Sequence, residues 1–158
     1  PEVARTLEGL NVLAGSAPAF VPNTPKVLRV ARTCYDHLAG TTAVALRDRF
    51  VTIGWLTASS QEDSAYDITP KGAKALESLG IDLAAARATR RRFAYACLDW
   101  SERRPHIGGA VGAALLQLLL HKRWVSQHAD SRAISITSLG NRELQRRFGV
   151  SIEADDQS

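Results

Sequence analysis

The sequence has no methionine, only two cysteines and 6% aromatic residues. Two cysteines are too few for a disulfide-stabilised secreted scaffold and fit a reducing cytoplasm instead. The longest apolar run, residues 107–120, is interrupted by Gln117 and is shorter than the ~20 residues that cross a bilayer. Since no charged segment followed by an apolar one opens the chain, we expect neither a secretory signal nor a membrane partner. The chain starts at Pro1 rather than at methionine, so we expect it to be part of a longer protein.

The charge is mildly basic. The chain has 158 residues and a net charge of +4, and a chain of this length can bury a core as one domain. Arginines cluster at residues 87–92, 103–104 and 142–147. Such clusters can bind phosphate, but acidic residues such as Glu102 and Glu143 lie beside them. We therefore expect solvated, ion-paired helix faces at these positions.

The sequence contains one pattern of residues twice. The two cysteines lie 63 residues apart, and after an insert at residues 100–105 the spacing between equivalent residues becomes 68 or 69. The equivalent pairs include Cys34 and Cys97, His37 and His106, Trp55 and Trp124, Gly72 and Gly140, and Leu76 and Leu144. Because cysteines, histidines, tryptophans and turn glycines all fall in register, we interpret the chain as two copies of one supersecondary unit.

The apolar spacing and the turn residues predict the elements of each copy. In the first copy we expect helices at 26–38 and 41–53, a hairpin with strands at 55–57 and 66–68, and a helix that Thr69 caps and Gly80 ends. In the second copy we expect helices at 83–103 and 107–123, a hairpin with strands at 124–127 and 133–136, and a helix at 138–148. The predicted fold class is mainly α with short β-hairpins (α+β), a tandem duplication of a helix–helix–hairpin–helix unit.

The N-terminal residues carry a different pattern. Residues 1–15 predict a helix with a narrow apolar seam of the kind that packs against one other helix. The seam consists of Val3, Leu7, Leu10 and Ala14. We expect this helix to form the contact of a homodimer. It is followed by a linker at 16–25, the first repeat at 26–82, the second at 83–152 and a flexible tail at 153–158.

Two kinds of string carry a resemblance to a known family. The strings GWL at 54–56 and YDITPKG at 66–72 look like the wing of a winged helix-turn-helix protein, and both repeats have this pattern. The longer strings ARTCYDHLAG at 31–40 and CLDWSERRPH at 97–106 resemble the C-terminal extension of a subset of bacterial ArsR-type transcriptional regulators. The resemblance implies that the helix-turn-helix that reads DNA lies upstream of Pro1. The N-terminal helix here would then be the tail of that domain and its dimer contact.

The cysteines, histidines and neighbouring acids form the candidate site. The candidate ligand-binding or polar-core residues are Cys34, Asp36, His37, Cys97, Asp99 and His106. Cys34 and His37 are one helical turn apart in the predicted helix, and His106 follows Pro105 at a predicted helix start. If the repeats pack about a pseudo-twofold axis, both cysteines and both histidines converge. Cys2His2 composition suits tetrahedral zinc, and the two aspartates can orient the imidazoles.

Three interpretations of this site stay open, namely a packed polar core, a pocket for a small organic effector, and a site for zinc or another divalent metal. We expect the first interpretation, a packed polar core without a bound cofactor, because buried cysteines often only fill a core.

The leading functional hypothesis is a non-enzymatic regulatory domain that senses an effector or dimerises, in a protein that binds DNA through its upstream domain. One alternative is direct nucleic-acid binding, against which the apolar composition of residues 109–120 argues. The other is a small enzyme that uses Cys34 or Cys97, although we find no catalytic motif in the sequence.

Overall fold

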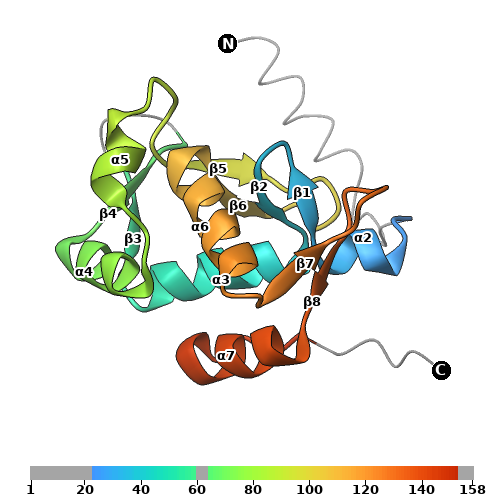
Figure 1. Cartoon of the computed structure of the whole chain (residues 1–158). Helices are drawn as coiled ribbons and strands as arrows, with labels where there is room; N and C mark the ends of the chain where they lie inside the picture. The colour runs from blue at the N-terminus through green and yellow to red at the C-terminus, as the bar shows by residue number, and fades with distance from the viewer. Residues whose placement is uncertain (1–22, 60–63, 153–158) are drawn as a thin grey trace, which may run out of the picture.

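The computed structural model describes residues 23–59 and 64–152, and in these ranges it is an α+β fold with short antiparallel hairpins, as predicted (Figure 1). The first half contains α2 (Lys26–Val30), β1 (Arg32–Cys34), β2 (His37–Ala39), α3 (Thr41–Thr52), β3 (Leu56–Ala58), β4 (Tyr66–Ile68) and α4 (Pro70–Leu79). The second half contains α5 (Leu83–Ala88), β5 (Tyr95–Leu98), β6 (Pro105–Gly108), α6 (Gly109–His121), β7 (Val125–Gln127), β8 (Ile134–Ile136) and α7 (Ser138–Phe148). Strands pair in sequence order, β1 with β2, β3 with β4, β5 with β6 and β7 with β8.

The predicted long first helix of each repeat is wrong. At 26–38 the chain makes only one short helix and then the β1–β2 hairpin, because Ala31 already has extended backbone angles (φ −156°, ψ 140°). At 83–103 the chain leaves α5 at Ala88 and later forms β5. Val27, an apolar residue of the predicted first helix, is 43% exposed. Each repeat is therefore a helix–hairpin–helix–hairpin–helix unit.

The one hairpin predicted for each repeat, which is the second hairpin in the structure, and the predicted last helix are confirmed. Thr69 accepts a hydrogen bond from the Gly72 amide at 3.0 Å, and Thr137 accepts one from the Gly140 amide at 2.9 Å, so both helices begin with a side-chain cap. A Cβ at Gly140 would lie 1.8 Å from the Trp124 carbonyl oxygen. The absence of a side chain there lets the helix start directly against the hairpin, and the same holds at Gly72 and Trp55.

The two repeats exchange backbone contacts. Arg32 at the start of β1 bridges Ala133 of the second repeat, and Tyr95 at the start of β5 bridges Ala65 of the first. The helices also contact the opposite repeat, since α6 packs on β2 and α3 packs on β6. Figure 1 shows the β1–β2 hairpin lying beside β5–β6 on one side and β7–β8 on the other. The contacts between the halves are thus reciprocal, as expected of two repeats that pack about a pseudo-twofold axis.

The core lies around α3 and α6, between the two sets of hairpins. Leu46 and Phe50 of α3 and Leu119 of α6 are each 1% exposed. Phe148 of α7 packs edge-on against Phe50, with ring centroids 5.3 Å apart, so the last helix of the second repeat closes the core of the first. In the part of the chain that the structure describes, no helix has the length and apolarity of a membrane span.

The start of α3 has no side-chain cap. Thr41 and Thr42 do not cap the helix. Their hydroxyls donate to the carbonyl oxygens of Arg29 at 3.0 Å and Val30 at 2.9 Å. Gly40 occupies the N-cap position with a φ of 94°. A side chain there would lie 2.5 Å from the Arg29 carbonyl oxygen, so this turn needs glycine both for its backbone angle and for its space.

Candidate functional site

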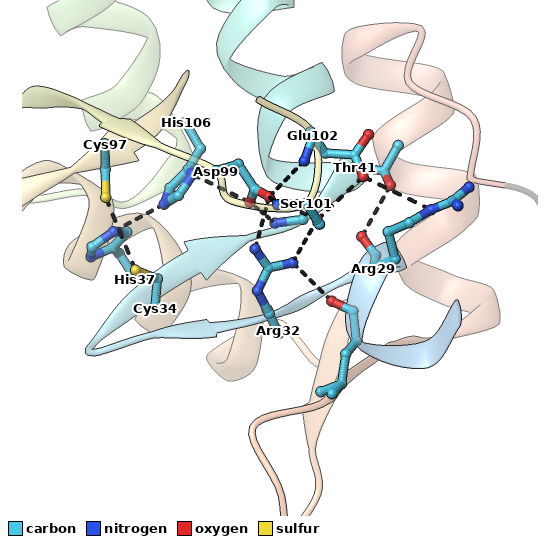
Figure 2. Close-up of polar contacts among 12 residues, drawn as sticks. Arg29, Arg32, Cys34, His37, Thr41, Cys97, Asp99, Ser101, Glu102 and His106 are labelled. Carbon is cyan, nitrogen blue, oxygen red and sulfur yellow. Dashed lines mark hydrogen bonds and ion pairs between the residues drawn. The ribbon is translucent and has the colours of Figure 1, made fainter. Parts of the chain in front are cut away.

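Two hairpins carry the four candidate ligands. In the β1–β2 hairpin Cys34 stands directly opposite His37, and in the β5–β6 hairpin Cys97 stands directly opposite His106. Residues that face each other across an antiparallel pair project from the same face of the hairpin. The two hairpins turn these faces toward each other, so the four side chains point to one place (Figure 2). One nitrogen or sulfur atom from each of the four lies within 4.8 Å of the others.

The expected convergence is therefore present, but the expected route to it is wrong. Cys34 and His37 are not one helical turn apart, and His106 does not begin a helix, since it lies in β6. A cross-strand pair brings two side chains as close as a helical turn does. The pseudo-twofold axis then places the second pair against the first, because equivalent residues near such an axis face each other.

The shortest distances join equivalent residues. The Sγ atoms of Cys34 and Cys97 are 4.0 Å apart, and the Nε2 atoms of His37 and His106 are 3.2 Å apart. Both imidazoles are 1% exposed, whereas the two cysteines are partly exposed. The cluster is therefore closed on its histidine side and open to solvent on its cysteine side.

Each histidine has an aspartate behind it. The Nδ1 atom of His37 is 3.3 Å from Asp36 Oδ1, and the Nδ1 atom of His106 is 3.5 Å from Asp99 Oδ2. The second distance is too long for a hydrogen bond, and His106 Nδ1 is buried without a hydrogen-bond partner among the described residues. These distances agree with the expectation that the two aspartates flank the imidazoles, and an orienting role for them remains a proposal.

Asp99 is also the centre of a polar network that our sequence analysis did not identify. Arg32 donates to Asp99 Oδ1 at 2.8 Å, and the two side chains are 1% and 0% exposed. Asp99 accepts further hydrogen bonds from the Gly40 amide at 2.7 Å and from the Ser101 hydroxyl at 2.8 Å. Arg32 belongs to the first repeat and Asp99 to the insert-bearing loop of the second, so this ion pair joins the halves beside the cluster (Figure 2).

The six-residue insert was the one sequence signal for this network. It adds Ser101 and Glu102, whose amides both donate to Asp99 Oδ1, at 3.0 and 3.1 Å. A short polar side chain that accepts from amides two and three residues ahead is typical of a tight loop. Nothing in the sequence indicated Arg32 as the partner, because the apolar spacing predicts a helix at its position.

The surroundings set the protonation of the cluster. Burial lowers the pKa of His37 and lowers that of His106 to about 4, so the histidines are held neutral. Burial, together with the neighbouring Cys34, raises the pKa of Cys97 to about 11. Burial alone would also raise the pKa of Asp99, but the hydrogen bonds from Arg32, Gly40 and Ser101 outweigh it and hold that pKa at about 2.

Asp36 has an arginine partner of its own. Arg91 forms an ion pair with Asp36, with its second nitrogen 3.1 Å from Oδ1. The hydrogen bond from Arg91 lowers the pKa of Asp36, against the raising effect of burial. Arg91 also lines a groove of about 470 Å³ between α5 and α6, with an apolar floor that includes Ala86 and Ala114. The groove and the cluster therefore meet at the Arg91–Asp36 pair.

The dimer-contact candidates Val3, Leu7, Leu10 and Ala14 lie outside the described residues, as do the linker up to residue 22 and the tail at 153–158.

Comparison with known proteins identifies a relative among transcriptional regulators. Over 127 residues the chain is 42% identical to the uncharacterized HTH-type transcriptional regulator YdfF of Bacillus subtilis (strain 168). The match covers 80% of this chain and 55% of the relative, so the chain spans about half the length of that protein. No family model matches the chain, and no solved structure matches it either.

Proposed function

We propose that this chain is the regulatory part of an ArsR-like transcriptional regulator, in which DNA is bound by a domain upstream of Pro1. The similarity to an HTH-type regulator over 127 residues supports this role most directly. Because the chain spans only about half of that relative, the relative has room for a separate DNA-binding domain. The finer assignment to ArsR-like proteins rests on the strings at 31–40 and 97–106.

The structure supports a regulatory role over direct DNA reading. A recognition helix must present polar side chains to base edges in the major groove. Instead, α6 buries eight of its thirteen residues, and α3 is covered by β6 of the other repeat. The basic side chains of Arg146 and Arg147 are engaged by Glu143 at 2.8 and 2.7 Å. Direct nucleic-acid binding through α7 or the loops stays the alternative hypothesis.

An enzymatic role receives less support than a binding role. A nucleophilic cysteine needs a lowered pKa and access to substrate. Burial and the neighbouring thiol act in the opposite direction at Cys97, whose pKa is raised to about 11. A cytoplasmic, non-enzymatic regulator accounts for these features without a catalytic group.

The proposed mechanism is a shift between two packings of the repeats. An effector that binds between the β1–β2 and β5–β6 hairpins contacts both halves at once, so it favours the packing in which the hairpins are close. The N-terminal helix, as the contact of a homodimer, would pass this preference to the DNA-binding domain. The cluster at the axis is the first candidate for the effector site, and the α5–α6 groove beside Arg91 is the second.

Selection from a random duplex DNA library tests this proposal. Two proteins are compared, this chain alone and the longer protein that carries it behind its upstream segment. We expect the longer protein to enrich a defined sequence. We expect this chain alone to enrich none and to bind duplex DNA only in the non-specific range, with a Kd of about 10⁻⁶ M or weaker at physiological salt.

Two results would overturn the proposal. The first is enrichment of a sequence by this chain alone, bound with a Kd of about 10⁻⁸ M or tighter, because the chain would then read DNA itself. The second is a longer protein that enriches no sequence, because no DNA-binding activity would then remain for this chain to regulate.

A further inference from the structure

The distances in the cluster match those of a tetrahedral metal site. Zinc binds cysteine sulfur at about 2.3 Å and histidine nitrogen at about 2.0–2.1 Å. A regular tetrahedron with these bonds separates its two sulfurs by about 3.8 Å and its two nitrogens by about 3.3–3.4 Å. Here the two Sγ atoms are 4.0 Å apart and the two Nε2 atoms 3.2 Å apart. Both edges agree with the tetrahedron to within a few tenths of an ångström.

The separations between sulfur and nitrogen atoms must shorten by at most about 1.2 Å to match a zinc site. All four ligand atoms lie within 4.8 Å of one another, whereas a sulfur and a nitrogen on the same zinc ion are about 3.6 Å apart. Cys34 and Cys97 are at the open side of the cluster, where a rotation of each thiol about its Cα–Cβ bond can bring its sulfur closer to the imidazoles. The buried histidines already have the spacing that the ion requires.

The possible protonation states of the two imidazoles favour a cation between them. A neutral imidazole has a proton on one ring nitrogen only. If that proton is on Nε2, to bridge the 3.2 Å gap, the same ring presents a bare Nδ1 lone pair to a carboxylate 3.3 or 3.5 Å away. If both rings keep their protons on Nδ1, toward the carboxylates, two bare Nε2 atoms face each other. A metal ion between the rings uses both Nε2 lone pairs and leaves each Nδ1 proton facing a carboxylate, 3.3 Å away at His37 and 3.5 Å away at His106, as in other carboxylate–histidine–metal arrangements.

The charged groups of the cluster would neutralise one bound divalent ion. Two thiolates neutralise the two charges of Zn²⁺. Each flanking carboxylate already has a guanidinium partner, Arg91 for Asp36 and Arg32 for Asp99. Binding therefore consists of one Zn²⁺ displacing two thiol protons, with no charge left uncompensated in the buried region.

We propose that Cys34, His37, Cys97 and His106 bind one zinc ion, which joins the two repeats at their pseudo-twofold axis. Two sulfurs and two imidazole nitrogens are the ligand set of a zinc site rather than of a magnesium or calcium site. All four positions of the ion are filled by protein, which is the arrangement of sites that hold structure rather than activate water. This site does not depend on the proposed regulatory role, because it belongs to the chain itself.

Metal analysis of this chain, purified under reducing conditions without chelator, tests the site. We expect one equivalent of zinc per chain. X-ray absorption should show two sulfur neighbours at about 2.3 Å and two nitrogen neighbours at about 2.0 Å. Exchange for Co²⁺ should produce the strong visible absorption of tetrahedral cobalt and a thiolate charge-transfer band, with the intensity saturating at one equivalent.

Two variants give the comparison. Cys34→Ser combined with Cys97→Ser removes both sulfurs and should abolish stoichiometric binding. His128→Gln is the matched control, because His128 is exposed and hydrogen-bonded to Ser135 outside the cluster, and it should bind one equivalent as before. If the double variant does not fold, the cobalt titration and X-ray absorption of the unmutated chain still decide.

Three results would overturn the proposal. One is an unmutated chain, reduced and folded, that takes up neither Zn²⁺ nor Co²⁺ at micromolar concentration. Another is metal bound with a neighbour set other than two sulfurs and two nitrogens, or retained in the double variant. The third is a Cys34–Cys97 disulfide in protein prepared under reducing conditions, which would mean that the thiols pair with each other instead of binding metal.

Discussion

Replacing Arg32 by methionine tests the buried ion pair that joins the two repeats. Arg32 is 1% exposed and donates to Asp99 Oδ1 at 2.8 Å, to the Leu28 carbonyl at 2.9 Å and to the Ser101 hydroxyl at 3.1 Å. Methionine fills much of the same volume with an unbranched apolar chain, so the change removes the charge and the three hydrogen bonds with little cavity.

The size of the effect follows from what Asp99 loses and keeps. Removing one partner of a buried ion pair costs about 3–5 kcal/mol, since the other charge is left uncompensated. Asp99 still accepts from the amides of Gly40, Ser101 and Glu102, which places the loss near the lower end. We expect the free energy of unfolding to fall by about 3 kcal/mol, and the Tm by about 6–12 °C for a chain of this size.

The control is the same substitution in an exposed ion pair. Arg104 pairs with Asp48, and its side chain is 62% exposed. Exposed pairs contribute about 0–1 kcal/mol, so Arg104→Met should change the free energy of unfolding by no more than that. Adding Asp99→Asn to Arg32→Met should recover part of the loss, because it removes the unpaired charge.

Urea unfolding followed by circular dichroism provides the free energies, measured with a chelator present so that metal binding does not contribute. If Arg32→Met lowers stability by less than about 1 kcal/mol, and so resembles Arg104→Met, the network does not hold the repeats together. The same conclusion follows if the second substitution recovers nothing.

Three further predictions address other parts of the chain. Gly140→Ala should lower the free energy of unfolding by about 1–3 kcal/mol, although alanine is the better helix former, because its Cβ would lie 1.8 Å from the Trp124 carbonyl oxygen; an unchanged urea midpoint would contradict this. Leu7→Glu should convert the expected homodimer to a monomer in sedimentation analysis, because a charge would be buried in the predicted seam, and a monomeric unmutated chain would refute the expectation. The Glu143 carboxyl should titrate at about 2 by NMR, because Arg146 and Arg147 hydrogen-bond its ionised form. Any stability from these pairs is present above the ordinary pKa and is lost as the pH falls through about 2, and a midpoint near 4.5 would show that the pairs do not form.

Local chemistry made much of the fold predictable. Thr69 followed by Pro70 and Gly72 specifies a capped helix start that needs no information from the rest of the chain. Gly80 specifies the end of the same helix, because it adopts the left-handed conformation there. The second repeat uses Thr137, Gly140 and Gly149 in the same way. Where side chains and backbone angles within five residues decide the structure, the sequence prediction agrees with the observed elements.

The first hairpin of each repeat could not be predicted in this way. Residues 31–38 show apolar residues at helical spacing, yet they form β1 and β2. Part of the reason lies far along the chain. The Thr33 amide donates to the Arg132 carbonyl at 2.8 Å, and the Ala31 carbonyl accepts from the Ile134 amide at 3.0 Å. Partners from the other repeat satisfy the backbone of these residues as strands, so tertiary contacts override a local helical pattern.

The cluster was predictable even though its secondary structure was not, and the reason is the duplication. A repeat that packs on its copy about a twofold axis brings each residue near the axis close to its own equivalent, whichever element carries it. Cys34 and His37 needed only to be neighbours within one repeat for Cys97 and His106 to complete the set. A helical turn and a cross-strand pair both meet that requirement. The insert at 100–105 occurs in the second repeat only, so the duplication did not predict that Arg32 pairs with Asp99. The Arg32–Asp99 ion pair joins the two repeats beside the cluster and has no equivalent in the duplicated pattern. Replacing Arg32 therefore tests the contact between the repeats without removing any of the four candidate ligands.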